Sequence, residues 1–220
     1  MRIYDQLLQF PLFQGMSRAE LLQLAGNTKF GFQKQPPRKT IIREGDTCSQ
    51  LLFLISGKLE FERQSDDHTY MVTEQVHAPW LVQPEVLFGA QPQYLYTVNT
   101  LTEAHFILLS KDEVLRLLDD FLIFRLNMLN LLSTQSQRRA HLPWRRAPKS
   151  LRERIVRFML DHCTYPAGQK EFHILMRHLA QEVGDSRLDV SRELNAMQDE
   201  GLLQLARGRI IIPSLERLFM

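Results

Sequence analysis

The sequence predicts an α+β protein made of three consecutive parts. Short apolar runs separated by turn residues fill residues 28–110, and leucines three or four residues apart fill 111–141. A pattern of two helices joined at a glycine lies within 142–220. Closely spaced short strands are typical of a β-sandwich or barrel, and the leucine spacing is typical of a helix. We therefore expect domains at 1–110, 111–141 and 142–220.

Composition excludes several classes of protein. Apolar residues make up 44% of the 220 residues and charged residues 24%, which is ordinary for a folded chain and argues against disorder or a collagen-like rod. No apolar run approaches the length of a membrane-spanning helix, and the start MRIYDQLLQFPLF lacks a signal-peptide pattern. Cys48 and Cys163 are too few for a disulfide framework or an iron–sulfur cluster. We expect a cytoplasmic protein with no membrane partner.

The N-terminal part is expected to begin with a helix and continue as strands. Ser17 and Glu20 form a capping-box pattern for a helix over 17–26. A polar hairpin tip is expected at 64–68. The strands are expected at 40–42, 51–55, 58–63, 69–72, 96–101 and 104–109.

One long helix is expected over 111–141, capped by Ser110. Its leucine spacing is close to the 3.5-residue seam of a coiled coil. Such a helix spans about 45 Å, more than one small β domain, which favours a homodimer contact. The alternative, a helix packed on its own β domain, stays open. The predicted dimerisation residues are Leu115, Leu118, Leu122, Leu126, Leu129 and Leu132.

Residues 174–203 carry a helix–turn–helix pattern. Gly184 supplies the tight turn, and Ser186 is placed to cap the second helix, whose positive end can then face a phosphate. The residues expected to point inward are Leu175, Leu179 and Val183 on the first helix and Val190, Leu194 and Met197 on the second. Those expected to point outward are Arg187, Leu188, Ser191 and Arg192. A plain three-helix packing unit is the alternative.

Basic residues flank this pattern on both sides. Two short β runs around Arg207-Gly208-Arg209 predict a winged hairpin with arginines at its tip. A basic run upstream is usually a solvated face, but beside a helix–turn–helix it is a candidate phosphate-contacting surface. It comprises Arg138, Arg139, Arg145, Arg146, Lys149, Arg152, Arg154 and Arg157. The predicted DNA-binding residues are Ser186, Arg187, Ser191, Arg192, Arg207 and Arg209.

The order of these parts resembles the Crp/Fnr family of bacterial transcription regulators. REGDTCSQLLFLISGKLEFERQ at 43–64 and VGDSRLDVSRELNAMQDEGLL at 183–203 carry the resemblance. It implies an N-terminal β-roll sensor domain (a double-stranded β-helix or jelly-roll), a long dimerisation helix and a C-terminal winged helix–turn–helix. The implied function is a homodimeric regulator on a near-palindromic DNA operator. A glutamate common in the family is replaced by Leu188, which alters the expected half-site.

The effector pocket implied by the resemblance departs from the family pattern. Members that bind cyclic nucleotides hold the sugar and phosphate with a Gly-Glu pair and an arginine followed by a hydroxyl residue. Here Glu85 matches the glutamate, Pro84 replaces the glycine, and Tyr94-Leu95 falls where the arginine pair belongs. A buried phosphate without a cation is costly, so cyclic AMP is not expected. We expect an unknown small effector or none, and no cofactor.

Other functions were weighed against this one. Haem binding through His68, His77 or His105 and a thiol switch at Cys48 stay open. No phosphate-binding glycine loop, HExxH or GxSxG motif occurs, and His173 and His178 have a spacing that does not place both on one metal, so an enzyme is not expected. The main alternative is a sensor whose C-terminal domain binds a protein instead of DNA. RNA polymerase stays open as a further partner.

Overall fold

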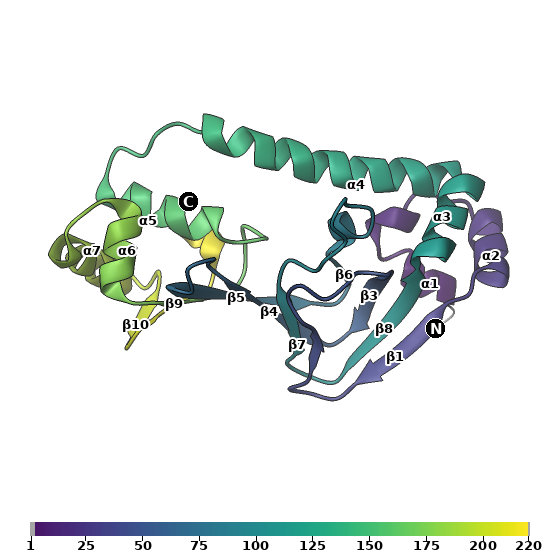
Figure 1. The fold of residues 1–220 in the computed structure, drawn as a ribbon, viewed down its shortest axis with the longest axis horizontal. Helices are drawn as coiled ribbons and strands as arrows, with labels where there is room; N and C mark the ends of the chain where they lie inside the picture. Colours follow the sequence, from purple (N-terminus) through teal and green to yellow (C-terminus); the bar gives the residue numbers. More distant parts are fainter. Residues whose placement is uncertain (1–2, 220) are drawn as a thin grey trace. The chain divides into compact units, whose positions relative to one another are not determined.

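The chain forms two compact units, and one hairpin of its N-terminal half belongs to the second unit. The computed structural model describes residues 3–219 (Figure 1). One unit, here called the β-roll unit, contains residues up to 59 together with 77–95 and 99–144. The other, here called the winged unit, contains 60–76, 96–98 and the residues from 145 onward. The domain limits 1–110, 111–141 and 142–220 stay a prediction.

A four-stranded antiparallel sheet supports the β-roll unit. Its strands, in spatial order, are β1 (Gly31–Gln35), β8 (Ala104–Ser110), β3 (Gln50–Ser56) and β6 (Trp80–Val82). The central strand β3 is an unbroken apolar run because both of its faces are covered. On one face, the ring centroids of Phe53 and Phe10 lie 5.0 Å apart. The expected strands at 51–55 and 104–109 are confirmed, whereas β1 and β6 were not expected.

The other strands have the order β10-β11-β9-β5-β4-β7-β2. Strands β4 and β7 contribute residues to both units. Ser65 and His68, which has a φ of +59°, close the hairpin between β4 and β5 as expected. Strand β9 was not expected. The bounds are β2 (Thr40–Ile42), β4 (Lys58–Gln64), β5 (Tyr70–His77), β7 (Thr97–Thr100), β9 (Lys170–Ile174), β10 (Gln204–Ala206) and β11 (Arg209–Ile212).

Short helical segments precede the first strand and close the core of the β-roll unit. The capping box is confirmed, since the Glu20 amide donates to Ser17 Oγ and the Ser17 amide donates to a Glu20 carboxylate oxygen at 2.7 Å. Phe13 contacts the rings of both Phe53 and Phe124. The segments are α1 (Ile3–Leu7), the 3-10 turn η1 (Pro11–Phe13), α2 (Arg18–Asn27) and a later 3-10 turn η2 (Pro84–Val86).

The prediction of one long helix over 111–141 is wrong. The structure has α3 (Lys111–Asp120), capped by Ser110 as expected, and α4 (Leu122–His141), separated by Phe121 in an extended conformation. The Phe121 ring is buried, and this burial favours the extended conformation over a continuous helix. The Arg125 guanidinium donates to two carbonyls at the end of α3, which stabilises the break.

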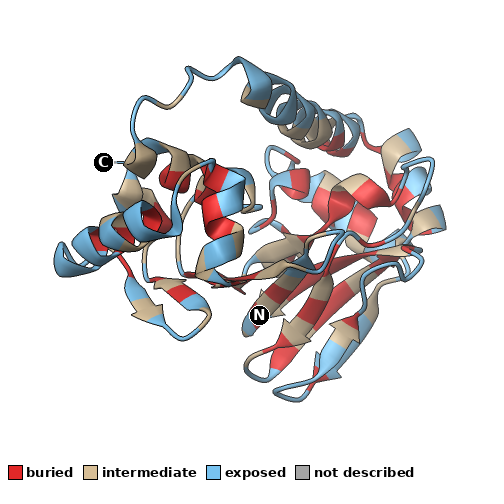
Figure 2. Ribbon diagram, turned by 60° about the vertical axis from the view of Figure 1, so that its left-hand side comes forward, coloured by how far each residue is buried: buried red, intermediate tan, exposed pale blue. Residues whose placement is uncertain are grey.

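Helix α4 packs on the β-roll unit through one face and leaves the predicted leucine face uncovered. Phe124 and Met128 are buried, whereas Leu122, Leu126 and Leu129 are 45–60% exposed (Figure 2). Leu115 is also exposed, and Leu118 and Leu132 are half-buried. The open alternative, packing on the helix's own domain, is therefore correct for one face, and the dimer contact stays a prediction for the other. Within residues 3–219, no helix has the length and hydropathy needed to span a bilayer.

Candidate nucleic-acid interface

One core holds the helices and strands of the winged unit together. Its helical elements are α5 (Leu151–Asp161), α6 (Met176–Val183), α7 (Arg187–Asp199) and η4 (Leu215–Leu218), whereas the preceding 3-10 turn η3 (Leu142–Trp144) belongs to the β-roll unit. Val190, Leu194 and Met197 are fully buried, as expected for the inner face of α7. Leu179 and Val183 are buried too. The inward assignment of Leu175 is wrong, because Leu175 precedes the helix and Ile174 of β9 takes the buried place.

The junction between α6 and α7 has the geometry that the sequence predicts. Gly184 has a φ of +64°, which closes α6 because its amide reaches carbonyls of the last helical turn. Ser186 caps α7, since its hydroxyl accepts the amide of Asp189 at 3.1 Å. These two residues set the direction in which α7 leaves the turn.

The outer face of α7 presents basic side chains to solvent. Arg187 and Arg192 are exposed, and Ser191 is half-buried, with its carbonyl accepting the Asn195 side-chain amide. Arg192 lies 3.4 Å from the Asp189 carboxylate but keeps 70% of its side chain exposed. Leu188 is also exposed, at 60%. These side chains of α7 are therefore accessible to a partner.

The winged hairpin is present, with its two arginines in different positions. Strands β10 and β11 pair so that Ala206 opposes Arg209, which leaves Arg207 and Gly208 as the turn. Gly208 has a φ of +70°, and its carbonyl accepts the amide of Ile174. Arg207 is exposed at the turn itself, whereas Arg209 begins β11 and lies 3.2 Å from the Glu171 carboxylate.

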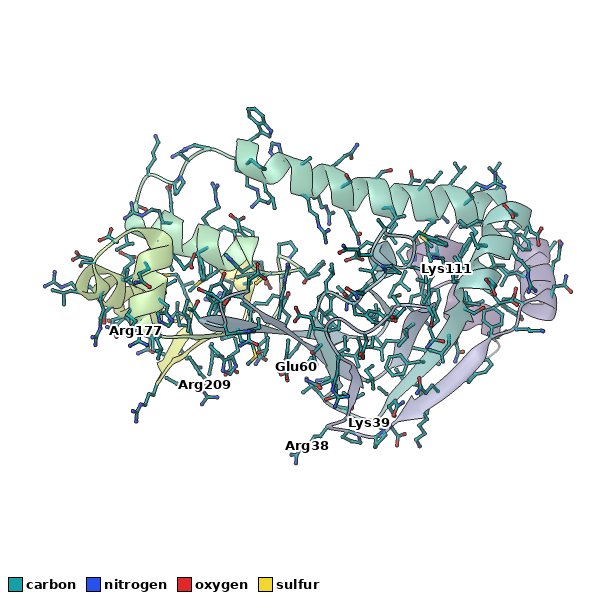
Figure 3. The ribbon with its side chains drawn as sticks, in the orientation of Figure 1. Arg38, Lys39, Glu60, Lys111, Arg177 and Arg209 are labelled. Atoms are coloured by element: carbon teal, nitrogen blue, oxygen red, sulfur yellow. The ribbon has the colours of Figure 1, made fainter. Side chains whose placement is uncertain are left out.

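A hollow of about 320 Å³ lies among the starts of α6 and α7 and the wing, and three arginines line it. They are Arg177, Arg187 and Arg209, and Figure 3 shows Arg177 and Arg209 on the same side of the winged unit. Guanidinium groups placed around a hollow can hold phosphate oxygens with paired hydrogen bonds. The arrangement is thus suited to a nucleic-acid backbone.

Sequence reasoning missed Arg177. Its Nε donates to Nε2 of His178 at 3.0 Å, and Nδ1 of His178 lies 3.0 Å from the carbonyl oxygen of Thr69. The missed signal was the start of α6, because a helix assumed to include Leu175 hides the fact that Arg177 lies in the first turn. Once the helix begins at Met176, Arg177 falls at the exposed end beside the wing.

Five of the eight residues in the upstream basic run have partners within the chain, which narrows the expected phosphate surface. Arg152 contacts Glu193 and Glu200, and these hydrogen bonds raise the pKa of Arg152 and lower that of Glu200. Arg154 forms an ion pair with Asp185. Arg145 pairs with Asp161, and Arg157 donates to the Arg146 carbonyl. Arg138, Arg146 and Lys149 are exposed, and Arg139 lies 3.6 Å from Glu85.

The stretch that the resemblance assigns to the effector pocket is tied to neighbouring backbone. Tyr94 is buried, and this burial, together with nearby Cys48, raises the pKa of its hydroxyl. The Leu95 amide donates to the Gln83 side chain at 2.7 Å. Glu85 is largely covered and faces Arg139 of α4. The tyrosine that the resemblance places at the arginine position is therefore buried, and the effector pocket itself stays a prediction.

The remaining candidate ligands are scattered. His68 lies at the tip of the β4–β5 hairpin, His77 ends β5, and His105 contacts Glu103 at 3.2 Å. Cys48 is buried with its thiol near the Gln50 carbonyl. Across the residues that the structure describes, no three His, Cys, Asp or Glu side chains gather in an arrangement that could hold a metal ion.

Family models match two successive parts of the chain. A family model described as a cyclic nucleotide-binding domain matches residues 32–121, and one described as a Crp-like helix-turn-helix domain matches residues 153–219. No curated protein sequence is a significant match.

Solved structures share the fold. The catabolite activator protein of Thermus thermophilus is 22% identical, with 95% of this chain and 96% of that chain covered and a TM-score of 0.52. The sensor domain of the transcriptional regulator DNR from Pseudomonas aeruginosa is 21% identical, with 62% of this chain and 89% of that chain covered and a TM-score of 0.52.

A cyclic nucleotide-binding fold followed by a winged helix–turn–helix defines a class of transcription regulators. With both family models matched in that order, the chain belongs to the Crp/Fnr family. It has the architecture of such a regulator, with a DNA-binding helix–turn–helix at its C-terminal end.

Proposed function

We propose that this protein is a homodimeric transcription regulator that binds a near-palindromic DNA operator in response to an unknown small effector or to none. The observation that carries the proposal is the exposed arginine face of α7 next to the hollow lined by Arg177, Arg187 and Arg209. A protein-docking face is more often apolar or aromatic at its centre, so the alternative of a protein partner is the less favoured one.

The two ends of this face have different tasks. The N-terminus of α7 is the positive end of the helix dipole, so it suits a backbone phosphate. Arg187 and Arg192 extend from the exposed face, where an arginine can bind guanine O6 and N7 as a pair of acceptors. The wing arginine Arg207 is placed for a phosphate contact. Specificity is therefore expected from α7, and general affinity from the wing.

The homodimer rests on the uncovered leucine face of α3 and α4. Burying it against the same face of a second copy makes a two-fold interface. A two-fold dimer presents two copies of α7 to successive major grooves about 34 Å apart, which is why the operator is expected to be a near-palindrome. The cytoplasm follows as the site of action, and RNA polymerase stays a prediction without an assigned surface.

Cyclic AMP is not the proposed effector. Tyr94 is buried where a phosphate-binding arginine is expected, and Glu85 already faces Arg139. Calorimetry with cyclic AMP and cyclic GMP should show no binding at micromolar concentration. Saturable binding in that range would refute this part of the proposal, because it would require another cation for the phosphate.

The DNA proposal is tested by selecting duplexes from a random pool with the wild-type protein and titrating variants on them. Arg187→Ala and Arg192→Ala should each weaken binding by about 1–3 kcal/mol if they read a base, with the loss confined to sequences that carry that base. Arg217→Ala serves as the control, because Arg217 is an exposed arginine of η4 that does not line the hollow. Wild-type affinity in both α7 variants would show that α7 is not the reading element, and failure to enrich any duplex would favour a protein partner.

A further inference from the structure

Within the winged unit, the β4–β5 hairpin adds a strand to the sheet that carries the wing. Strand β5 pairs antiparallel with β9, from Tyr70 opposite Ile174 to Glu74 opposite Lys170. Val72 enters the core of the winged unit and is 3% exposed. The Tyr70 ring lies 5.4 Å from that of Phe158. A segment some hundred positions earlier in the sequence thus covers the free edge of the wing sheet, which is a common way to protect an edge strand.

A buried ion pair fixes the register of this pairing. Nζ of Lys170 lies 2.8 Å from the Glu74 carboxylate, and the two side chains are 1% and 6% exposed. Glu74 also accepts the backbone amides of Thr164 and Tyr165. A slip of one residue would turn Glu74 to the opposite face of the sheet and leave the Lys170 charge buried without its partner, so a single docked arrangement is favoured.

The tip of the hairpin reaches the candidate DNA surface. The Thr69 carbonyl accepts Nδ1–H of His178, and Nε2 of His178 in turn accepts from Arg177, which lines the hollow. Asp67 is held at the tip by Ser65 and Thr69, and these hydrogen bonds lower its pKa. The charged Asp67 carboxylate is therefore connected to His178 by two hydrogen bonds, both through the backbone of Thr69.

We propose that the docked hairpin is an autoinhibitory latch on the DNA-binding surface. Docking engages Arg177 through His178 and brings the hairpin tip, which carries Asp66 and Asp67, to His178, so DNA binding and hairpin docking oppose each other. The proposal rests on the DNA-binding function proposed above and adds its regulation.

The route of control follows from chain connectivity. The hairpin leaves the β-roll unit at Leu59 and returns to it at His77. A change in that unit can therefore pull on the latch through both of its strands. Because the coupling is reciprocal, DNA should also favour the undocked hairpin.

A reversible cross-link tests the latch. Met71 and His173 are paired across β5 and β9, so Met71→Cys/His173→Cys in a Cys48→Ser/Cys163→Ser background should form a disulfide when oxidised with diamide. The oxidised protein should bind the selected duplex at least tenfold more weakly than the reduced protein, and reductant should restore binding. Met71→Cys alone, treated identically, is the control and should not change.

Two further outcomes decide the matter. Failure of the disulfide to form would overturn the docking, and a disulfide that leaves binding unchanged or tighter would overturn the inhibition. Absence of binding by the wild-type protein, measured first, would instead refute the DNA-binding proposal. In the cross-linked protein, Asp66→Asn/Asp67→Asn should recover part of the affinity, whereas Asp119→Asn/Asp120→Asn, an equal charge change in the β-roll unit, should recover none.

Discussion

Arginines on α5 and α7 differ in where their partners lie. Arg152 and Arg154 of α5 are held by carboxylates of other elements, whereas Arg187 and Arg192 of α7 extend from an exposed face, where Arg192 lies 3.4 Å from Asp189 of its own helix. The sequence presents all four as positive charges near a helix–turn–helix. The difference teaches that a count of basic residues does not locate a nucleic-acid surface, because the arginines with internal partners serve the fold.

The two groups are nevertheless connected. Arg152 joins α5 to Glu193 and Glu200 at the C-terminal half of α7 and just beyond it, and Arg154 joins α5 to Asp185 in the turn before α7. The inner arginines therefore hold both ends of the helix whose outer arginines are available for DNA. Loss of an inner arginine should act on stability, and loss of an outer one on binding.

The largest expected effect concerns α4, where one face is buried within the chain and the leucine face is exposed. Leu122→Asp/Leu129→Asp should convert the proposed dimer into monomers and weaken binding to a duplex with two half-sites by about 10²–10⁴-fold, because the second contact is no longer tethered. Light scattering and titration measure both. On the opposite face, Phe124→Ala should lower the free energy of unfolding by about 3–5 kcal/mol and keep the mass of the dimer. An unchanged mass in the aspartate variant would refute the dimer contact.

Lys170 is the extreme case of a cation with an internal partner. Lys170→Met leaves the Glu74 carboxylate buried without its counter-charge, which should lower the free energy of unfolding by about 3–5 kcal/mol in urea denaturation. Glu74→Gln/Lys170→Met removes both charges and should recover most of that loss. Equal destabilisation by the single and double variants would show that the ion pair is not the cause.

Features set by local sequence were predictable. Ser17, Ser110 and Ser186 each cap the helix that the sequence assigns to them, because a cap depends on residues within one turn. The break at Phe121 was missed because the leucine spacing continues through it, and only burial of the ring in the tertiary structure interrupts the helix. Pairing of β5 with β9 joins positions 70 and 174, a relation that no local pattern contains.

The candidate site shows the same division. The exposed face of α7, its cap and the wing follow from periodicity and turn residues, and these were predicted. Arg177 depends on the position of the first residue of α6, and boundaries of this kind are the least certain part of a sequence-based assignment. The partners of Arg152 lie some 40 and 48 positions away, so its structural role could not be read from the sequence.

A direct comparison of the two helices gives a smaller effect. Arg152→Ala should lower the free energy of unfolding by about 1–3 kcal/mol, because Glu193 and Glu200 lose a charged hydrogen-bond donor. Arg192→Ala, on an exposed surface, should change it by less than about 0.5 kcal/mol. Urea denaturation of both variants under identical salt measures the difference. Equal free energies of unfolding would mean that the contacts of Arg152 with Glu193 and Glu200 do not stabilise the folded protein in solution.

The smallest effect concerns the two wing arginines. Arg207 is exposed at the turn, so Arg207→Ala should weaken binding to selected and scrambled duplexes alike and make the slope of log affinity against log salt shallower by about one. Arg209→Ala should change that slope less, because Arg209 must first leave Glu171 to reach a phosphate.

The ion pair of Arg209 makes this difference adjustable. Glu171→Gln removes the competing carboxylate and should therefore steepen the salt slope of the otherwise wild-type protein. In the Glu171→Gln background, Arg209→Ala should then make the salt slope shallower by as much as Arg207→Ala does. Salt titrations of the four proteins measure each step. Arg209→Ala changing the salt slope equally with and without Glu171 would show that the Glu171 carboxylate does not compete with DNA for Arg209. An ion pair within the chain would then not indicate whether a wing arginine can contact a DNA phosphate.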